Sequence, residues 1–430
     1  MDRDKTETGG CFLRCHRTKI WVIMIRNPRT ARKPNRLRTR IAQLAFLFAF
    51  AGATPATAAT ITALGSINSN GYGINGAGQV VGSSQPAFGI AQQAFLYSGG
   101  VITDLGTLGG SSSSAYGINA SGQVVGSAYT AGNAATNAFL YLNSSGVMTD
   151  LGTLGGPDSY AYGINNSGQI VGDADTTVLI PGNGNQHYSH AFLYSGGSMT
   201  DLGTLGGPES AALGINASGQ VVGFAYTASF QEYAFLYSGG VMTDLGTIGG
   251  FSSVSGAAGI NDSGQIVGVY TTDNNMYDQA FLYSSGIMTG LGTLGGSDSE
   301  AYGINDSGQV VGTSTTPGDA TFDAFLYSGG TMIDLNSLLP PGSNWQLTSA
   351  RAINDSGQIV GTGLYCGEEL AFVLDTDAPS SGPAGSCPVA PTPTPTPEPT
   401  SMALLGGGLA ILVLFRTKCD LREEFPAKAI

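Results

Sequence analysis

The sequence predicts an all-β fold in which seven four-stranded antiparallel blades close into a β-propeller. Three observations support this: a sequence unit repeated seven times, glycine-containing turns inside every unit, and one unit split between the two ends of the array. Among the 430 residues, 66 are glycine, but glycine does not recur at every third position, which excludes collagen. Apolar residues make up 42% of the chain and recur in short clusters, which excludes a disordered chain.

Each unit is marked by a Gly-Ile-Asn tripeptide, which becomes Ala-Ile-Asn in the last copy. The asparagines lie 44, 46, 51, 45, 44 and 49 residues apart. They are Asn75, Asn119, Asn165, Asn216, Asn261, Asn305 and Asn354. Spacings of this size equal the length of one propeller blade, so each unit is expected to form one blade.

Four strands are expected in each unit, and the second unit illustrates them. Its inner strand should include the Ala-Tyr-Gly-Ile-Asn segment at 115–119, and the next strand should begin at 123–126. The third strand should include Ala-Phe-Leu-Tyr at 138–141, and the outer strand Val-Met-Thr-Asp-Leu-Gly at 147–152. Aromatic and β-branched residues favour strands, and Asn-x-Ser-Gly between the first two strands is typical of a hairpin turn.

The two ends of the array complement each other. Thr62-Ala63-Leu64-Gly65 matches the outer strand of a unit, but no other part of a unit precedes it. The last copy ends at Ala371-Phe372-Val373-Leu374 and lacks an outer strand. Joining these segments would complete one blade and remove two exposed sheet edges, which favours a closed ring. An open β-solenoid or a stack of two sheets is the alternative.

Charge is distributed very unevenly along the chain. Twelve of the 17 Lys and Arg residues lie within the first forty positions. Between Ala59 and Ala390, Arg351 is the only basic residue and stands against 23 Asp and Glu, which leaves a net charge of −22. Such a body repels nucleic acid and anionic lipid, whereas cations and neutral polar ligands such as glycans remain possible. We align Arg351 with the glycine of the other units and expect it to have a structural role.

The N-terminal segment 1–58 has the pattern of a secretory signal peptide. A basic stretch precedes the apolar run 41–53, and Ala56-Thr57-Ala58 fits an A-x-A cleavage site, so Ala56 and Ala58 are the expected recognition residues. Met24 would begin a signal of more ordinary length.

The C-terminal region divides into three segments after the predicted propeller, which covers 59–378. A Pro/Thr/Ser-rich linker is expected at 379–400, an apolar sorting segment at 401–418 and an extension at 419–430. The fourteen apolar residues 402–415 reach about 21 Å as a helix, which is short of a ~30 Å bilayer core. We therefore expect only a transient membrane tether.

Two sets of motifs resemble known bacterial families. Pro397-Glu398-Pro399, followed by the apolar segment and then basic residues, resembles the PEP-CTERM sorting signal of Gram-negative bacteria. The repeated units, over roughly 61–375, resemble the HAF repeats of bacterial extracellular proteins, with the namesake histidine present only at His190. The resemblance implies processing by signal peptidase and an exosortase, and delivery to the cell surface or extracellular matrix.

Two cysteines, Cys366 and Cys387, belong to the expected exported body. An even pair in an oxidising compartment suggests a disulfide that ties the C-terminal segment to the last repeat, with two free thiols as the alternative.

Few residues suggest chemistry. Four residues of the third unit could ligate a metal, although a solvated polar loop is the simpler interpretation: Asp173, Asp175, His187 and His190. The Asn-Asp-Ser-Gly turns at Asn261, Asn305 and Asn354 invite a calcium site, but they lack several spaced carboxylates, so a structural turn is preferred. Asp in the repeated Asp-Leu-Gly segment is expected to tie turns within each blade.

The stretches between the second and third strands vary most among the units, and they should lie on one face of the ring. They carry aromatic side chains suited to sugars: Tyr188, Tyr226, Phe230, Tyr233, Tyr270, Tyr277 and Tyr365. The sequence thus predicts an exported structural or binding protein with no catalytic residues and no cofactor beyond calcium, and with a polysaccharide or matrix component as partner. The alternative is an extracellular glycan-active enzyme, a hydrolase or lyase, that uses carboxylates on the same face.

Overall fold

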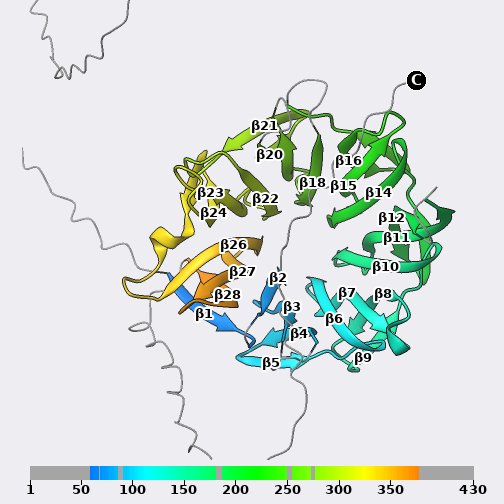
Figure 1. Cartoon of the computed structure of the whole chain (residues 1–430), viewed down its shortest axis with the longest axis horizontal. Helices are drawn as coiled ribbons and strands as arrows, with labels where there is room; N and C mark the ends of the chain where they lie inside the picture. Colours follow the sequence, from blue (N-terminus) through cyan, green and yellow to red (C-terminus); the bar gives the residue numbers. More distant parts are fainter. Residues whose placement is uncertain are drawn as a thin grey trace, which may run out of the picture. The chain divides into compact units, whose positions relative to one another are not determined.

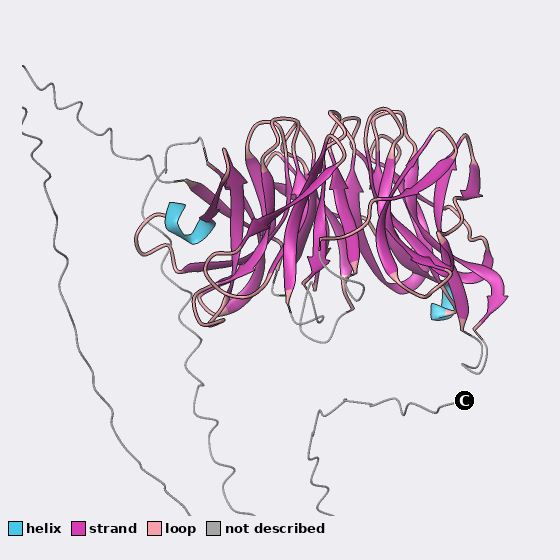
Figure 2. Ribbon diagram, turned by 90° about the horizontal axis from the view of Figure 1, so that it is seen from above, coloured by secondary structure: helices cyan, strands magenta, loops and turns pink. Residues whose placement is uncertain are grey.

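The computed structural model describes residues 59–376, except 67, 86–90, 181–185, 249–253 and 273–276. Their strands form seven antiparallel sheets of four strands each. The sheets are the blades of a propeller, arranged side by side in a ring (Figure 1). In the view turned by 90°, the strands run from one face of the ring to the other (Figure 2). The predicted fold class is confirmed.

The blades follow one another in chain order, and the last is completed by the first strand. Blade 1 contains β2 (Asn70–Ile74), β3 (Val80–Ser84), β4 (Gln93–Ser98) and β5 (Val101–Asp104). Blade 2 contains β6 (Gly109–Ile118), β7 (Gln123–Thr130), β8 (Thr136–Leu142) and β9 (Val147–Asp150). Blade 3 contains β10 (Gly155–Ile164), β11 (Ile170–Leu179), β12 (His187–Ser195) and β13 (Ser198–Asp201). Blade 4 contains β14 (Gly206–Ile215), β15 (Val221–Thr227), β16 (Glu232–Ser238) and β17 (Val241–Asp244). Blade 5 contains β18 (Ser255–Ile260), β19 (Ile266–Thr271), β20 (Asp278–Ser284) and β21 (Ile287–Gly292). Blade 6 contains β22 (Ser299–Ile304), β23 (Val310–Thr315), β24 (Phe322–Ser328) and β25 (Thr331–Asp334). Blade 7 contains β26 (Trp345–Ile353), β27 (Gln358–Tyr365), β28 (Glu368–Asp375) and β1 (Thr60–Leu64). Two short 3₁₀ turns, η1 (Ala131–Asn133) and η2 (Leu335–Leu338), complete the described elements.

Each blade is held by a packing pair that explains two of the repeated motifs. In blade 2, Gly126 of β7 lies opposite Phe139 of β8. A Cβ atom on Gly126 would approach the Phe139 ring to 2.8 Å and the Ser114 carbonyl oxygen to 2.0 Å. The phenylalanine of the Ala-Phe-Leu-Tyr segment is fully buried in all seven blades. Gly-Gln-Val-Val-Gly and Ala-Phe therefore recur together because the ring packs over a position where only glycine fits.

β1 closes the ring. It pairs with β28 from Thr60 opposite Asp375 to Leu64 opposite Ala371. The Leu64 side chain is fully buried. Ser69 joins blade 1 to blade 7, because its hydroxyl donates to the Leu64 carbonyl at 2.8 Å and accepts from the Ala371 amide at 2.9 Å. The predicted split blade is confirmed, and the open solenoid is excluded.

Several predictions fall outside the described residues. These are the signal peptide with Ala56 and Ala58, the linker, the sorting motif Pro397-Glu398-Pro399, the apolar segment and Cys387. Cys366 is disulfide-bonded, and its partner also lies outside the described residues, so pairing with Cys387 stays a prediction. In the part of the chain that the structure describes, no helix is long and apolar enough to cross a membrane.

Candidate functional site

The central channel is lined by the seven inner strands and has two ends that differ in chemistry. A belt of seven isoleucines, one from each Gly-Ile-Asn or Ala-Ile-Asn segment, lines both ends. On one side of this belt the seven asparagines line a cavity of about 240 Å³, which we call the asparagine end. On the other side lies a cavity of about 220 Å³ lined by tyrosines and Arg351, which we call the tyrosine end.

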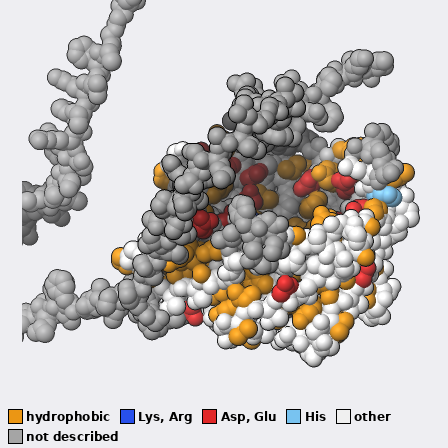
Figure 3. All heavy atoms as spheres, turned by 60° about the horizontal axis from the view of Figure 1, so that its bottom comes forward, with side chains coloured by type: hydrophobic (Ala, Val, Ile, Leu, Met, Phe, Trp, Pro, Cys, Tyr) orange, Lys and Arg blue, Asp and Glu red, His pale blue; other side chains and the backbone are white. Residues whose placement is uncertain are grey.

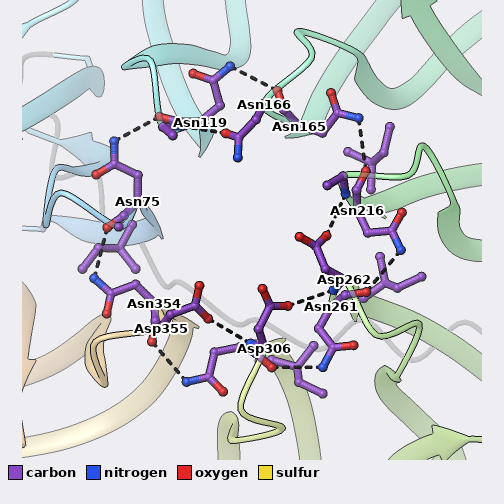
Figure 4. Close-up of a pocket in the computed structure, with 18 of the residues that line it drawn as sticks. Asn75, Asn119, Asn165, Asn166, Asn216, Asn261, Asp262, Asp306, Asn354 and Asp355 are labelled. Atoms are coloured by element: carbon purple, nitrogen blue, oxygen red, sulfur yellow. Dashed lines mark hydrogen bonds between the residues drawn. The ribbon is translucent and has the colours of Figure 1, made fainter.

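The asparagine end is a closed circle of hydrogen bonds (Figure 4). Each Asn side-chain amide donates to the backbone carbonyl of the equivalent Asn in the next blade, as from Asn119 to Asn165 at 3.1 Å. The circle closes where Asn354 donates to the Asn75 carbonyl at 3.0 Å. Within each blade the Asn side-chain oxygen accepts the amide four residues later, as from Gln123 at 3.0 Å. Every Asn is buried and hydrogen-bonded at both side-chain atoms, so this end is built for stability.

The residue after each Asn adds a partial second circle, which Figure 4 also shows. The Asp262 amide donates to Asp306 at 2.9 Å, and the Asp306 amide donates to Asp355 at 2.9 Å. These carboxylates therefore link neighbouring turns. Within the described ranges, no group of three His, Cys, Asp or Glu residues is arranged to hold a metal ion.

The tyrosine end is formed by the residue two positions before each isoleucine. Four of these residues line the cavity, namely Tyr302, Arg351, Tyr72 and Tyr116. Tyr162 of blade 3 adjoins Tyr116. We call these five residues, which lie in consecutive blades, the aromatic arc. Neighbouring rings touch, with centroids 5.3 Å apart for Tyr72 and Tyr116 and 5.5 Å apart for Tyr116 and Tyr162. The arc gives the wall of this cavity large apolar faces with polar hydroxyl tips.

Blades 4 and 5 interrupt the arc, because they have Leu213 and Ala258 at the same position. Two positions earlier in the sequence, blades 4 and 5 have Ala211 and Gly256, where blade 3 has Tyr160. The mouth of the channel is therefore asymmetric, with an aromatic half and a half lined by smaller side chains.

Arg351 corrects our alignment of the last repeat. Ala352, not Arg351, stands where the other units have glycine, and Arg351 takes the place of the tyrosine. Its guanidinium carbon lies 4.1 Å from the centroid of the Tyr302 ring, in a cation–π arrangement. The Tyr302 hydroxyl in turn donates to Glu300 at 2.8 Å. Arg351 is half-buried in the channel wall, which the sequence alignment did not indicate.

Acidic side chains also lie near the centre of the ring. In Figure 3, acidic side chains lie in and around the hollow at the centre of the ring. Burial raises the pKa of Asp173 to about 6, while the hydroxyls of Tyr162 and Ser189 oppose the rise. Asp173 thus lies against a member of the aromatic arc. Burial and the nearby Glu232 also raise the pKa of Glu209.

The structure does not bring the four predicted metal ligands together. The predicted loop is largely strand, with Asp173 and Asp175 in β11 and His187 and His190 in β12. His190 lies opposite Ala174, so it points to the other face of the blade from Asp173 and Asp175, because side chains alternate along strands. Its ring nitrogen Nδ1 is 2.9 Å from Asp201 instead. His187 Nδ1 contacts the Thr176 carbonyl oxygen at 2.6 Å.

None of the predicted ligand-face aromatics lines the channel cavity. Phe230 (69% exposed) and Tyr277 (42% exposed) are open to solvent. Tyr270 packs against the core of blade 5, and Tyr365 packs against Trp345 at 5.1 Å. The other three lie half-buried in strands, at Tyr188, Tyr226 and Tyr233. Burial and Glu232 raise the pKa of Tyr226 to about 12.

The repeated Asp of the outer strand has the predicted structural role. Its side chain accepts the backbone amide two residues later, as from Gly106 to Asp104 at 2.8 Å and from Gly152 to Asp150 at 2.8 Å. In blade 5 this Asp is replaced by Gly290, where a Cβ atom would come within 2.8 Å of the Tyr270 hydroxyl. The lack of a side chain at Gly290 therefore leaves space for Tyr270, a tyrosine specific to blade 5.

A second, polar cavity of about 180 Å³ lies between blades 2 and 3, next to the aromatic arc. Tyr160 lines it and stacks in parallel on Tyr162, with ring centroids 6.4 Å apart. Hydroxyl groups dominate the rest of its wall, from Ser112, Ser113, Ser114, Ser127, Tyr129 and Thr136. This hydroxyl-rich pocket therefore adjoins the aromatic arc through the contact between Tyr160 and Tyr162.

The fold and the channel define a seven-bladed propeller whose inner strands make one uniform end, lined by asparagines, and one varied, aromatic end. The chain belongs to the family described as "Protein of unknown function (DUF3466)", whose model matches residues 108–279 and, in an overlapping match, 210–382. No curated protein matches the sequence.

Solved structures similar to this chain are distant. A puromycin-hydrolyzing peptidase of Mycobacterium tuberculosis is 12% identical, with a TM-score of 0.48 over 73% of this chain and 52% of its own, so this chain spans about half its length. An oligogalacturonate lyase of Vibrio parahaemolyticus is 9% identical, with a TM-score of 0.48 over 73% and 93%. Similarity at this level says nothing of activity.

Proposed function

We propose that this protein is a non-catalytic carbohydrate-binding module and that the tyrosine end of the channel is its binding site. The observation that supports this is the aromatic arc, where adjoining tyrosine faces and hydroxyls line a cavity open at one face of the ring. Binding pockets typically combine apolar walls with a few polar groups that fix orientation. Sugars present the matching surfaces, namely apolar C–H faces edged by hydroxyls.

The face of the ring also agrees with a recognition role. β11 ends and β12 begins at the edge of the sheet where β10 starts, so the variable stretches and the tyrosine end share one face. Units repeat closely at the asparagine end and differ at this face. Sequence variation on a constant frame is typical of recognition surfaces.

A glycan array probed with the purified full chain tests the proposal. We expect binding to at least one oligosaccharide, lost in Tyr116→Ala and kept in Phe230→Ala, because Tyr116 lines the channel and Phe230 is an exposed aromatic outside it. Absence of binding across the array, or equal loss in both variants, contradicts it.

A glycan-active enzyme is the rival, and one observation favours it. Asp173 is a buried carboxyl whose pKa is raised to about 6, and it lies against Tyr162 of the aromatic arc. A carboxyl of this kind suits general acid chemistry. Incubation of the full chain with polysaccharides, with and without calcium, decides between the two: released product that disappears in Asp173→Asn would establish the enzyme.

We further propose that the protein is exported and processed by signal peptidase and an exosortase at its two ends. The signal-like N-terminus and the Pro397-Glu398-Pro399 motif support this, as does the disulfide bond of Cys366. Terminal sequencing and an intact mass of the surface-associated protein test it. We expect a start near Ala59 and loss of the segment after the Pro-Glu-Pro motif, and an intact precursor in the cytoplasm would contradict it.

A further inference from the structure

Arg351 is the one position where the aromatic arc carries a charge. Four other blades place tyrosine there, and the strand that surrounds Arg351 is otherwise a regular copy of the inner strand. Between Ala59 and Ala390 the sequence has no other Lys or Arg against 23 Asp and Glu. The single Lys or Arg side chain of this acidic region, Arg351, therefore lies in the wall of the channel cavity.

The guanidinium has no anionic partner among the described residues. It forms no ion pair with any described carboxylate. Glu300, the nearest acidic neighbour of its stacking partner, is engaged by the Tyr302 hydroxyl. The guanidinium carbon lies 4.1 Å from the centroid of the Tyr302 ring, and this contact supplies no negative charge.

A half-buried guanidinium with no carboxylate partner in the protein is suited to bind an anionic ligand through two parallel hydrogen bonds. The planar fork of arginine fits a carboxylate, and charge-assisted bonds of this kind are about twice as strong as neutral ones. The net charge of −22 between Ala59 and Ala390 limits the ligand charge, because the acidic body would repel a polyanion. The geometry therefore favours one carboxylate at the channel and neutral groups beyond it.

Resting on the carbohydrate-binding function proposed above, we propose that Arg351 and Tyr302 form a carboxylate subsite that selects a glycan with a single uronic acid residue at the tyrosine end. The sugar ring lies against the aromatic arc and its carboxylate pairs with Arg351. The neutral remainder of the glycan extends toward Tyr160 and the hydroxyl-lined pocket between blades 2 and 3.

Matched sugar pairs test this inference with the purified full chain. The probes are disaccharides ending in glucuronate, galacturonate or mannuronate, each compared with the same disaccharide ending in the neutral hexose. Calorimetric titration should show about tenfold or tighter binding for at least one acidic member over its neutral partner. Raised salt should weaken the acidic member only.

Arg351→Tyr is the sharpest variant, because it restores the residue found in four other blades. We expect it to unfold within a few degrees of the unchanged protein and to bind the acidic and neutral members of each pair alike. Arg351→Lys should lose part of that preference, because it keeps the charge but not the fork.

The outcomes separate the two proposals. Neutral and acidic sugars that bind equally, or a preference that survives in Arg351→Tyr, overturn the carboxylate subsite and leave carbohydrate binding standing. If no sugar of the set and none on the glycan array binds, the proposed function fails and the subsite fails with it. Tighter binding of short peptides through a C-terminal carboxylate would also overturn the inference.

Discussion

The two ends of the channel come from the same seven inner strands, yet they differ in how their side chains are used. At the asparagine end each Asn forms hydrogen bonds within its own blade and with the next, so the same residue stands in all seven units. Three residues earlier on the same strands, the tyrosine end holds Tyr, Leu, Ala and Arg. A position whose polar atoms are all used by the ring cannot vary, whereas one that faces an open cavity can. Variation inside a strict repeat thus locates the surface that is free to bind.

Both ends depend on ring closure, and breaking that closure should have the largest effect. Leu64→Ala removes a fully buried side chain that packs against Val80, Phe95 and Val360. We expect a loss of about 4 kcal/mol in the free energy of unfolding, measured by denaturant titration. Val101→Ala on the exposed strand β5 is the control and should change stability by less than about 0.5 kcal/mol. Equal effects would contradict closure by β1.

Two substitutions at the asparagine end, one in blade 2 and one in blade 3, separate the buried circle of hydrogen bonds from the exposed one. Asn119→Ala removes the bonds to Gln123 and Asn165 and leaves buried groups without partners, so we expect a loss of about 3 kcal/mol. Asn166→Ala removes only an exposed bond to the Ala120 amide and should cost little. Binding of sugar by the Asn119→Ala protein that remains folded should be unchanged. Loss of binding without loss of stability would reverse the roles we assign.

The buried Asp173 gives the tyrosine end a pH dependence. Its pKa is raised from 3.8 to about 6 in the folded protein, so the folded state binds the proton more tightly than the unfolded state. The stability that this group contributes is present below pH 4 and is lost as the pH rises toward 6 and above. The rise corresponds to at most roughly 3 kcal/mol.

Asp173→Asn should remove this slope from a plot of unfolding free energy against pH between 3 and 8. Asp104→Asn is a suitable control, because Asp104 is an exposed carboxylate of the outer strand of blade 1. A slope that persists in Asp173→Asn would show that other carboxyls cause it.

The outer-strand aspartates should give the smallest effect. Asp104→Ala removes one exposed hydrogen bond to the Gly106 amide, and blade 5 folds with Gly290 at the equivalent position. We expect a loss of about 0.5 kcal/mol, measured by thermal unfolding. A loss several times larger would mean that these turns stabilise the ring more than the blade 5 exception implies.

The sequence predicted the fold because its signals are local and repeated. The register of β1 with β28 followed from the split motif at Leu64 and Ala371, and the Asp-Leu-Gly turns followed from side-chain chemistry within two residues. The inter-blade bond from Asn119 to Asn165 could not be predicted in the same way, because it joins residues that only the closed ring brings together.

The sequence placed the variable stretches on the face of the ring that also holds the tyrosine end, but it did not indicate the residues that line the channel cavity. We expected the variable stretches to be loops, but β11 continues to Leu179. Asp173 and His190 are therefore strand residues, and their side chains lie on opposite faces of the blade. Because we aligned Arg351 with the glycine instead of the tyrosine of the other units, we did not predict that it belongs to the aromatic arc. The available signal was the position two residues before the isoleucine, at Tyr72 and its equivalents, because it varies most within this segment.

The most direct test of the account is a calorimetric titration of a glycan found on the array against two variants, one at each end of the channel. Tyr116→Ala lies at the tyrosine end, and Asn166→Ala lies at the asparagine end. We predict that Tyr116→Ala weakens binding by about tenfold or more, whereas Asn166→Ala binds like the unchanged protein. Weakened binding in Asn166→Ala, with none in Tyr116→Ala, would contradict the assignment of the two ends.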